Sequence, residues 1–250
     1  MERLLNYAMD IGEKMLVCGA EVHRVEESIR LICRSFSAKR IDVFIITSSM
    51  VATIYTDDGK SYTQTRRITS IGTDYEKLHK LNELSRKICE KRIEIDDIDR
   101  ELVSIDKTKT YPLWLEFIGY AVIAAAFTLF FGGGMIEAAV SLCVGAIVRF
   151  GMLISEKAVP NKIFSKFFSA AIATALAFLA VKIGLIENVD KIIIGNIMTL
   201  IPGIGLTNAI RDLFTGDSIA GLLRTIEAVL FALAIAAGYF LVAVLGGMIL

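Results

Sequence analysis

The sequence has few of the residues and motifs from which common active sites are built. Its 250 residues include 2 histidines, 4 cysteines, 3 prolines and 1 tryptophan, and the formal net charge is zero. The cysteines follow no short metal-ligand or redox spacing, so we expect no metal ion or cofactor. A glycine-rich phosphate loop and a recognisable Ser/His/Asp pattern are also missing, so no enzymatic activity is predicted. Without a basic field, no nucleic-acid partner is expected.

Charged residues are scarce in the second half of the chain. Residues 1–112 hold 19 Lys/Arg and 19 Asp/Glu, which leaves 8 of the 27 of each sign for residues 113–250. Since 54% of the whole chain is hydrophobic, this distribution predicts a soluble domain over 1–112 and a membrane domain over 113–250. The N-terminus carries charges too often for the apolar core of a signal peptide. Because of the apolar segment over 113–250, the lipid bilayer is an expected partner.

The first domain combines helical and strand patterns. Apolar residues recur every three or four positions from residue 3 to about 35, which is the period of one helical face, and Gly19 indicates a bend or a close helix contact. Three runs rich in β-branched and aromatic residues then predict antiparallel strands. These runs cover 41–47, 50–56 and 61–69. The helical period returns at 74–90, and "EIDDIDRELVS" indicates another helix. The pattern predicts an α+β domain.

Five apolar runs follow Pro112. They cover about 114–131, 135–154, 162–185, 191–210 and 219–248. A bilayer core of about 30 Å needs roughly 20 helical residues, which each run reaches with modest tilt or snorkelling ends. The loops on one side hold six Lys/Arg and those on the other side hold two. The positive-inside rule then predicts a multi-pass protein of the cytoplasmic (inner) membrane, with a cytosolic N-terminus and an external C-terminus.

The fourth run contains the poorest helix-forming residues of the membrane domain. Pro202, Gly203 and Gly205 lie near its centre, where proline removes a backbone donor and glycine lowers the cost of non-helical backbone. Backbone groups freed inside a bilayer must face protein or water. Interrupted helices of this kind form transporter sites. The alternative is a proline-kinked helix with glycines for close packing and an interfacial ion pair between Arg211 and Asp212.

Polar residues on the same stretch extend this candidate substrate pathway. The predicted pathway residues are Asn196, Pro202, Gly203, Gly205, Thr207, Asn208, Arg211, Asp212 and Asp217. A helix that resumes after Gly203 advances 1.5 Å per residue. The charged residues that follow it are therefore expected at the cytosolic mouth, while the proline and glycines lie near the bilayer midplane.

Two stretches carry a resemblance to a known family. "LIPGIGLTNAIRDLFTGD", followed by "GLLRTIEAVLFALAIAAG", resembles the conserved membrane stretch of the threonine/serine exporter family, and "CGAEVHRVEESI" is similar to its N-terminal signature. The resemblance covers essentially the whole chain. It implies a cytosolic domain and a membrane domain that exports small carboxylates or amino acids. With five spans, the chain resembles the first half of the split, YjjP-like branch, in which a second small membrane protein supplies further spans and succinate export is associated with the pair.

A second set of charged residues is assigned to gating or coupling. It comprises Glu21, Arg24, Glu26 and Glu227. The resemblance favours a role of the first three at the membrane entrance. Their spacing equally allows salt bridges of Glu21 with Arg24 and of Glu26 with Arg30 on a helix surface. Glu227 is either half of an interfacial pair with Arg224 or, if it lies deeper, a proton carrier.

Together these observations predict a five-span α-helical polytopic membrane protein with an N-terminal cytosolic α+β domain. We expect a secondary exporter of small carboxylates or amino acids. It is expected to work with a second small membrane subunit or as a homo-oligomer, because five spans cannot form two equal inverted halves. The rival hypotheses are a membrane-anchored regulatory or hydrolytic protein, whose soluble domain carries the activity, and a channel or scaffold.

Overall fold

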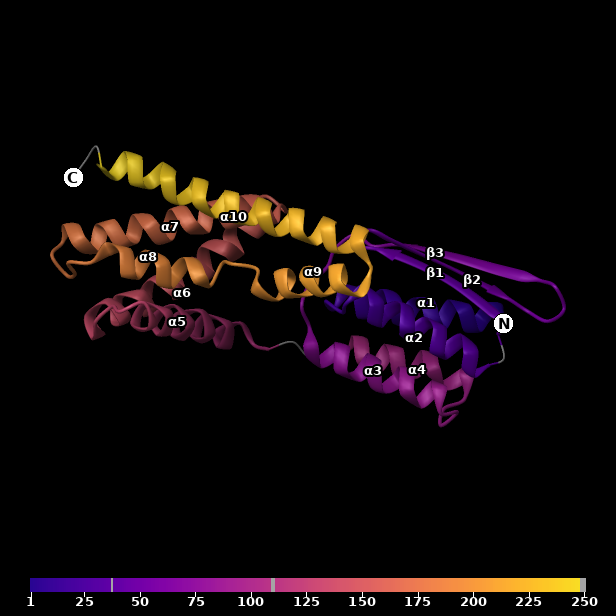
Figure 1. Cartoon of the computed structure of the whole chain (residues 1–250). Coiled ribbons are helices and arrows are strands. Elements are labelled where there is room, and N and C mark those ends of the chain that lie inside the picture. Colours follow the sequence, from indigo (N-terminus) through magenta and orange to yellow (C-terminus); the bar gives the residue numbers. More distant parts are fainter. Residues whose placement is uncertain (37, 109–110, 248–250) are drawn as a thin grey trace. The chain divides into compact units, whose positions relative to one another are not determined.

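Helices make up most of the chain, and a small sheet lies among the N-terminal elements (Figure 1). The computed structural model describes residues 1–36, 38–108 and 111–247. Its elements are α1 (Glu2–Val17), α2 (Val22–Ser35), β1 (Arg40–Ile46), β2 (Ser49–Tyr55), β3 (Ser61–Arg67), α3 (Tyr75–Cys89), the 3₁₀ helix η1 (Ile95–Asp97), α4 (Ile98–Asp106), α5 (Leu113–Phe130), α6 (Met135–Ala158), α7 (Lys162–Lys182), α8 (Val189–Met198), α9 (Gly203–Thr215) and α10 (Ser218–Gly247).

These elements form two units, and the division does not follow the chain order. Unit 1 consists of the described residues up to 108 together with Ile204–Thr225, so it includes nearly all of α9 and the start of α10. Unit 2 consists of the described residues from 111 to Gly203 and from Ile226 onward. The stretch after Pro202 therefore belongs with the N-terminal elements, although the sequence suggested a span continuous to about residue 210.

The sheet in unit 1 confirms the expectation of three antiparallel strands. Its order is β1-β2-β3, and the register pairs Val43 with Ala52 and Ala52 with Gln64. Met50, Ala52 and Ile54 alternate along β2 and are fully buried, because successive side chains of a strand point to opposite faces. They belong to the same core as the buried faces of α1, α2, α3 and α4. The periodic apolar residues of the sequence thus form the core of this unit.

The first helical run is divided into two helices at Gly19. This glycine has a φ of +94°, a conformation that residues with a Cβ rarely adopt. A Cβ at this position would also lie 2.8 Å from the carbonyl oxygen of Gly72. Helix α2 begins three residues later, at Val22. The short turn over Cys18–Glu21 presents backbone carbonyl groups to side chains of α9 and α10.

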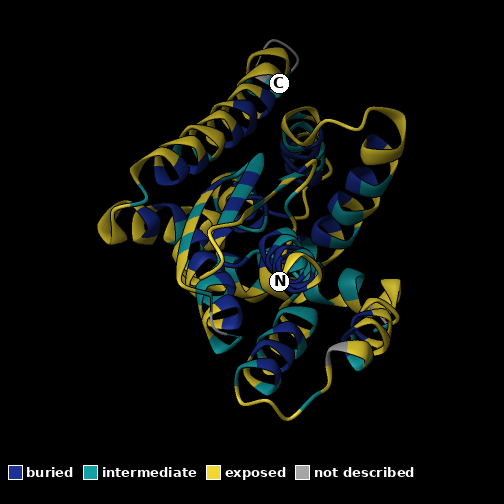
Figure 2. Ribbon diagram, turned by 90° about the vertical axis from the view of Figure 1, so that its right-hand side faces the viewer, coloured by how far each residue is buried: buried dark blue, intermediate teal, exposed yellow. Residues whose placement is uncertain are grey.

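The membrane-type helices contribute only Ala220, at the start of α10, to the described residues of this core. Among the described residues, four helices are long and apolar enough to cross a membrane, namely α5, α6, α7 and α10, or five spans if α8 and α9 count as one bent pair. Helix α10, which ends near the C label in Figure 2, is exposed over most of its length. Its exposed residues include Leu222, Val229 and Leu233. Apolar side chains exposed at this density match a helix surrounded by lipid.

Close helix contacts in unit 2 depend on small residues. A Cβ at Gly145 of α6 would lie 2.8 Å from the carbonyl oxygen of Tyr120 on α5, and one at Gly195 of α8 would lie 2.8 Å from that of Ala124. Small residues at such positions let helix backbones approach closely inside a membrane. The glycines therefore fix how α5, α6 and α8 pack together.

Candidate functional site

Within unit 1, the N-terminal signature meets the stretch that follows Pro202. The Nδ2 of Asn208 donates to the carbonyl oxygen of Gly19 at 3.2 Å. The Nη2 of Arg224 donates to the carbonyl oxygen of Ala20 at 2.9 Å, and the backbone N–H of Val22 donates to Oδ1 of Asp212 at 3.2 Å. Side chains of α9 and α10 thus hold the backbone of the turn between α1 and α2.

Two ion pairs complete this arrangement. Arg211 of α9 pairs with Glu21, and Nη1 of Arg224 lies 3.2 Å from Oδ2 of Asp212. The second contact is an ion pair whose geometry is not that of a hydrogen bond, because Oδ2 of Asp212 has no hydrogen-bond partner among the described residues. We call Glu21, Asn208, Arg211, Asp212 and Arg224 the polar cluster.

The two ion pairs of the polar cluster differ in burial. The side chain of Asp212 is 0% exposed and that of Arg224 8%, whereas Arg211 is 54% exposed. Removing one partner of a buried pair leaves an uncompensated charge and costs about 3–5 kcal/mol. The Asp212–Arg224 pair is therefore positioned to hold the cluster together. Arg211 keeps half of its side chain open to other ligands.

Glycines of α10 and of the preceding turn bring the two halves of the cluster together. Gly216 has a φ of +97°, which allows the reversal between α9 and α10. A Cβ at Gly221 would lie 2.9 Å from the carbonyl oxygen of Ala209, so α10 packs closely on α9. Arg224 follows Gly221 by less than one helical turn, which places its guanidinium against Asp212.

Two acidic residues lie beside the cluster. Oδ2 of Asp217 is buried and has no hydrogen-bond partner in the part of the chain that the structure describes. Glu26 on α2 is buried and pairs with Arg30 at 2.7 Å. Burial raises the pKa of Glu26, the negative charge of Asp217 adds to this rise, and Arg30 opposes it. Glu26 is therefore easier to protonate than an exposed glutamate.

The backbone is interrupted directly before α9. Helix α8 ends at Met198, and Thr199 and Leu200 then donate to the carbonyl oxygens three residues earlier, at 3.1 and 2.8 Å. Pro202 has no backbone N–H to donate, and α9 begins at Gly203. A turn of this kind inside an apolar run leaves backbone dipoles outside a regular helix, where they are available to a substrate or ion.

Asn196 is not part of the polar cluster. It lies in unit 2, is 0% exposed and donates to the carbonyl oxygen of Ile192 at 2.9 Å and to Oγ of Ser141 at 3.4 Å. Ser141 and Thr128 share a hydrogen bond of 2.6 Å. Oδ1 of Asn196 has no partner among the residues described. We call Thr128, Ser141 and Asn196 the hydroxyl–amide network.

The remaining candidates lie on the surface of the described structure. Arg24 and Glu227 are exposed, as are Gly203, Gly205 and Thr207. No group of three or more His, Cys, Asp or Glu side chains within the described ranges could hold a metal ion. The arrangement therefore offers charged hydrogen-bonding groups and an interrupted backbone as its means of binding a ligand.

Comparison with known proteins identifies the family. A family model described as "Putative threonine/serine exporter" matches residues 6–246. The chain belongs to the threonine/serine exporter family. The match includes both ends of the polar cluster, and it confirms the resemblance that the two sequence stretches carry. Membership also makes the chain a membrane transporter-family protein, in agreement with its apolar helices.

Relatives of this family differ in length. A "Probable threonine/serine exporter" of Mycobacterium tuberculosis is 24% identical over 239 residues, which are 94% of this chain and 45% of the relative. A "Pheromone-regulated membrane protein 10" of Candida albicans is 25% identical over 97% of this chain and 22% of its own length. The chain thus spans less than half of these two relatives. It covers 90% of a "Probable succinate transporter subunit YjjP" of Klebsiella aerogenes, at 24% identity. No solved structure matches the chain.

Sequence reasoning missed the partners within this family member's polar cluster. The local pairs that it allowed as alternatives were Glu21 with Arg24, Arg211 with Asp212 and Arg224 with Glu227. The structure instead pairs Glu21 with Arg211 and Asp212 with Arg224. The pair of Arg224 with Asp212 was missed because twelve positions and a turn separate them. Gly216 and Gly221 between them were the available signal, since they allow a tight reversal and a close helix contact.

Proposed function

We propose that this chain is a subunit of a secondary transporter that exports small carboxylates or amino acids across the cytoplasmic membrane. Family membership supports a transporter. The names of two relatives mention threonine/serine export and a succinate transporter subunit, and these substrates define the class that we propose. In this proposal unit 1 lies in the cytosol and the apolar helices lie in the membrane.

The observation that carries the proposal is the half-exposed Arg211 on α9, the helix that begins after the break at Pro202. A guanidinium presents donors in a planar fork that matches a carboxylate. Glu21 occupies this fork in the present structure. In the proposed cycle, the carboxylate of the substrate displaces Glu21 from Arg211 and then reaches the backbone groups around Pro202. When Glu21 pairs with Arg211 again, it competes with the substrate carboxylate and so favours release of the substrate.

The buried pair has a different role in this proposal. Asp212 and Arg224 hold the α1–α2 turn through Val22 and Ala20. This keeps Glu21 within reach of Arg211. Glu26, whose protonated form burial favours, is the candidate for coupling to a proton gradient. In this proposal Gly205, Thr207 and Asp217 line the approach to Arg211, whereas the buried Asn196 of unit 2 takes no part in it.

A second chain completes the proposed transporter. One relative is named a transporter subunit, and the match with this chain spans 90% of that relative's length. The match spans 45% of the longer exporter relative. The helices that pass the length and composition test make four or five spans in the described part of the chain. Five spans cannot form two equal halves. We therefore propose that a second small membrane protein, or a second copy, supplies the rest.

Efflux measurements test this function. Cells or vesicles are loaded with labelled succinate, threonine or serine, with and without the candidate partner chain. We expect efflux of at least one substrate, and a loss of about tenfold or more in Arg211→Gln, because a charge-assisted hydrogen bond contributes about 1.5–3 kcal/mol. Arg100→Gln is the matched control, since this exposed arginine pairs with Asp97. Equal efflux from both variants would remove Arg211 from the pathway.

Two further results would distinguish secondary transport from ATP-driven transport and from a membrane-anchored hydrolytic protein. Efflux that survives collapse of the proton gradient but stops on ATP depletion would contradict a secondary transporter. Hydrolysis of small esters or amides by the full chain, with efflux unchanged in Arg211→Gln and Asn208→Ala, would favour a membrane-anchored hydrolytic protein instead.

A further inference from the structure

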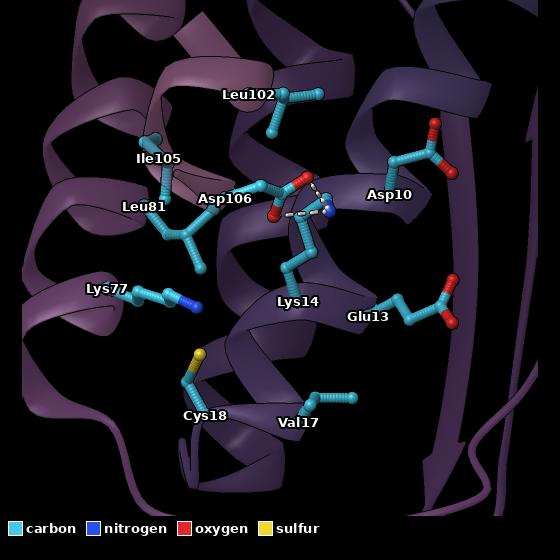
Figure 3. Close-up of a pocket in the computed structure, with 10 residues that line it drawn as sticks. All are labelled: Asp10, Glu13, Lys14, Val17, Cys18, Lys77, Leu81, Leu102, Ile105 and Asp106. Carbon is cyan, nitrogen blue, oxygen red and sulfur yellow. Dashed lines mark hydrogen bonds and ion pairs between the residues drawn. The ribbon is translucent and has the colours of Figure 1, made fainter. Parts of the chain in front are cut away.

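Unit 1 contains a cavity that the proposed transport pathway does not use. It has a volume of about 480 Å³ and lies between α1, α3 and α4 (Figure 3). This volume is within the range of about 300–1,000 Å³ found for small-molecule sites. Its walls combine charged side chains with apolar ones. The charge and the apolar surface that a ligand needs can therefore be inferred from these residues.

Most charges at this cavity are already paired. The Nζ of Lys14 donates to both carboxylate oxygens of Asp106 at 2.8 Å. Asp10 and Glu13 face Arg66, at 2.9 and 3.7 Å. Lys14 thus neutralises Asp106, whereas Asp10 and Glu13 share the single guanidinium of Arg66. In Figure 3 the carboxylates of Asp10 and Glu13 point away from Lys77.

Lys77 has the loosest ion pair at this cavity. Its Nζ lies 3.9 Å from the carboxylate of Asp74, which is beyond hydrogen-bond distance. Asp74 uses its other oxygen, Oδ1, to cap the first turn of α3 by accepting from the backbone N–H of Lys77 at 3.0 Å. Figure 3 shows the side chain of Lys77 reaching from α3 across the cavity toward Cys18. The ammonium group therefore has donors to spare inside a partly enclosed space.

The wall next to Lys77 is apolar. Leu81, Leu102 and Ile105 line it and are at most 7% exposed. The thiol of Cys18 adds to this wall in its neutral form, because burial raises its pKa. A ligand that suits this cavity has one anionic group and a short aliphatic part. The cation beside this wall is the single flexible ammonium of Lys77, and none of the described residues that line the cavity is an arginine. This arrangement fits a carboxylate better than a phosphate.

We propose that this cavity binds a small aliphatic carboxylate, with its carboxylate on Nζ of Lys77 and its chain against Leu81, Leu102 and Ile105. The site is separate from Arg211. It is nevertheless linked to the polar cluster through the backbone, since the N–H of Asp74 donates to the carbonyl oxygen of Cys18 at 3.1 Å and the next residue, Gly19, accepts from Asn208. A ligand on Lys77 is thus connected, through these two hydrogen bonds, to the α1–α2 turn that the polar cluster holds.

Binding to the purified full chain in lipid nanodiscs tests this site. The probe is 4-methylpentanoate, and the heat of binding is measured by titration calorimetry. We expect saturable binding, with an affinity at least tenfold weaker for Lys77→Gln and for the neutral isostere 4-methylpentanamide. Lys87→Gln is the matched control, because this lysine lies on the same helix and pairs with Glu83 at 3.3 Å. Its affinity is expected to equal that of the wild type.

Three results would overturn the proposal. These are no saturable binding by the wild-type chain, equal affinity for the amide and the carboxylate, or unchanged affinity in Lys77→Gln. The comparison of the two probes uses the wild-type chain alone, so it holds even if Lys77→Gln does not fold. The readout is independent of export. Loss of efflux in Arg211→Gln with intact binding at Lys77 would leave both proposals standing, whereas failure of either measurement affects only its own proposal.

Discussion

Unit 1 buries full charges in the polar cluster, whereas unit 2 buries neutral groups in the hydroxyl–amide network. Asp212 and Arg224 are 0% and 8% exposed and neutralise each other. Thr128, Ser141 and Asn196 are each 0% exposed and carry no charge. The cost of burial explains the difference, since an unpaired charge is far more costly to desolvate than an amide or a hydroxyl.

The two sets also differ in what a ligand would gain. In the polar cluster, Glu21 is already bound to the half-exposed Arg211, so an anionic ligand would have to replace it. In the hydroxyl–amide network, the buried Oδ1 of Asn196 lacks a partner among the described residues and would accept a hydrogen bond from water or a substrate hydroxyl. The buried charge pair and the buried neutral hydrogen-bonding groups thus lie in different units of this family member.

Breaking the buried charge pair is expected to have the largest effect. Asp212→Asn keeps an acceptor for the N–H of Val22 but leaves Arg224 buried without an opposite charge. We expect a loss of about 3–5 kcal/mol in the free energy of unfolding, which is on the order of 10 °C in melting temperature for a chain of this size. Thermal unfolding in detergent micelles measures it.

A second substitution and a control test the cause. Adding Arg224→Met to Asp212→Asn removes the unpaired cation and is expected to recover much of the loss. Asp97→Asn breaks the exposed pair with Arg100 and is expected to cost less than about 1 kcal/mol. If Asp212→Asn melted at the same temperature as Asp97→Asn, the buried pair would contribute no more than a surface pair.

Close packing around the neutral network gives the next largest effect. Gly195→Ala would place a Cβ 2.8 Å from the carbonyl oxygen of Ala124 and against Thr128. Because backbone atoms cannot move aside easily, we expect a loss of about 1–3 kcal/mol. Gly119→Ala on α5 is the matched control, since its Cβ would meet no atom within 4 Å. Equal melting temperatures for the two variants would show that α8 and α5 do not pack this closely.

The sequence predicted the elements better than their partners. The three strands begin and end within two residues of the β-branched runs, because residues such as Val43 and Ile54 favour a pleated, half-buried surface. Resemblance and polarity singled out Asn208, Arg211 and Asp212. Their partners on the α1–α2 turn lie about 190 positions away in sequence. Helical spacing rules compare only neighbours three or four positions apart, so they could not find these contacts.

Asn196 shows where one-dimensional reasoning joined residues that the fold separates. It was grouped with Asn208 because both lie on one apolar run. The chain interrupts that run between Met198 and Gly203, and the two asparagines belong to different units. Proline and glycine indicated the break, but no local pattern states which core the following helix joins. That depends on burial of Ala220 and on the contacts of Gly221 with Ala209.

The smallest predicted effect concerns Glu26, which lies next to the cluster and carries a charge that is only partly compensated. Burial raises its pKa in the folded chain, so the folded state binds more protons than the unfolded state between the ordinary pKa of a glutamate, about 4.3, and this raised value. Stability must therefore fall as the pH rises through that window. Glu26→Gln cannot lose the proton, so its melting temperature is expected to fall less over the same pH range.

Melting temperatures of the wild type, Glu26→Gln and Glu83→Gln at a series of pH values measure this difference. Glu83 is the control because it is an exposed glutamate paired with Lys87 on α3, and its variant is expected to follow the wild type. Parallel curves for the wild type and Glu26→Gln would contradict the raised pKa. A difference that grows through the window and persists above it, where Glu26 is ionised, would support the raised pKa. It would also show that the ionised form of Glu26 destabilises the fold beside Asp217.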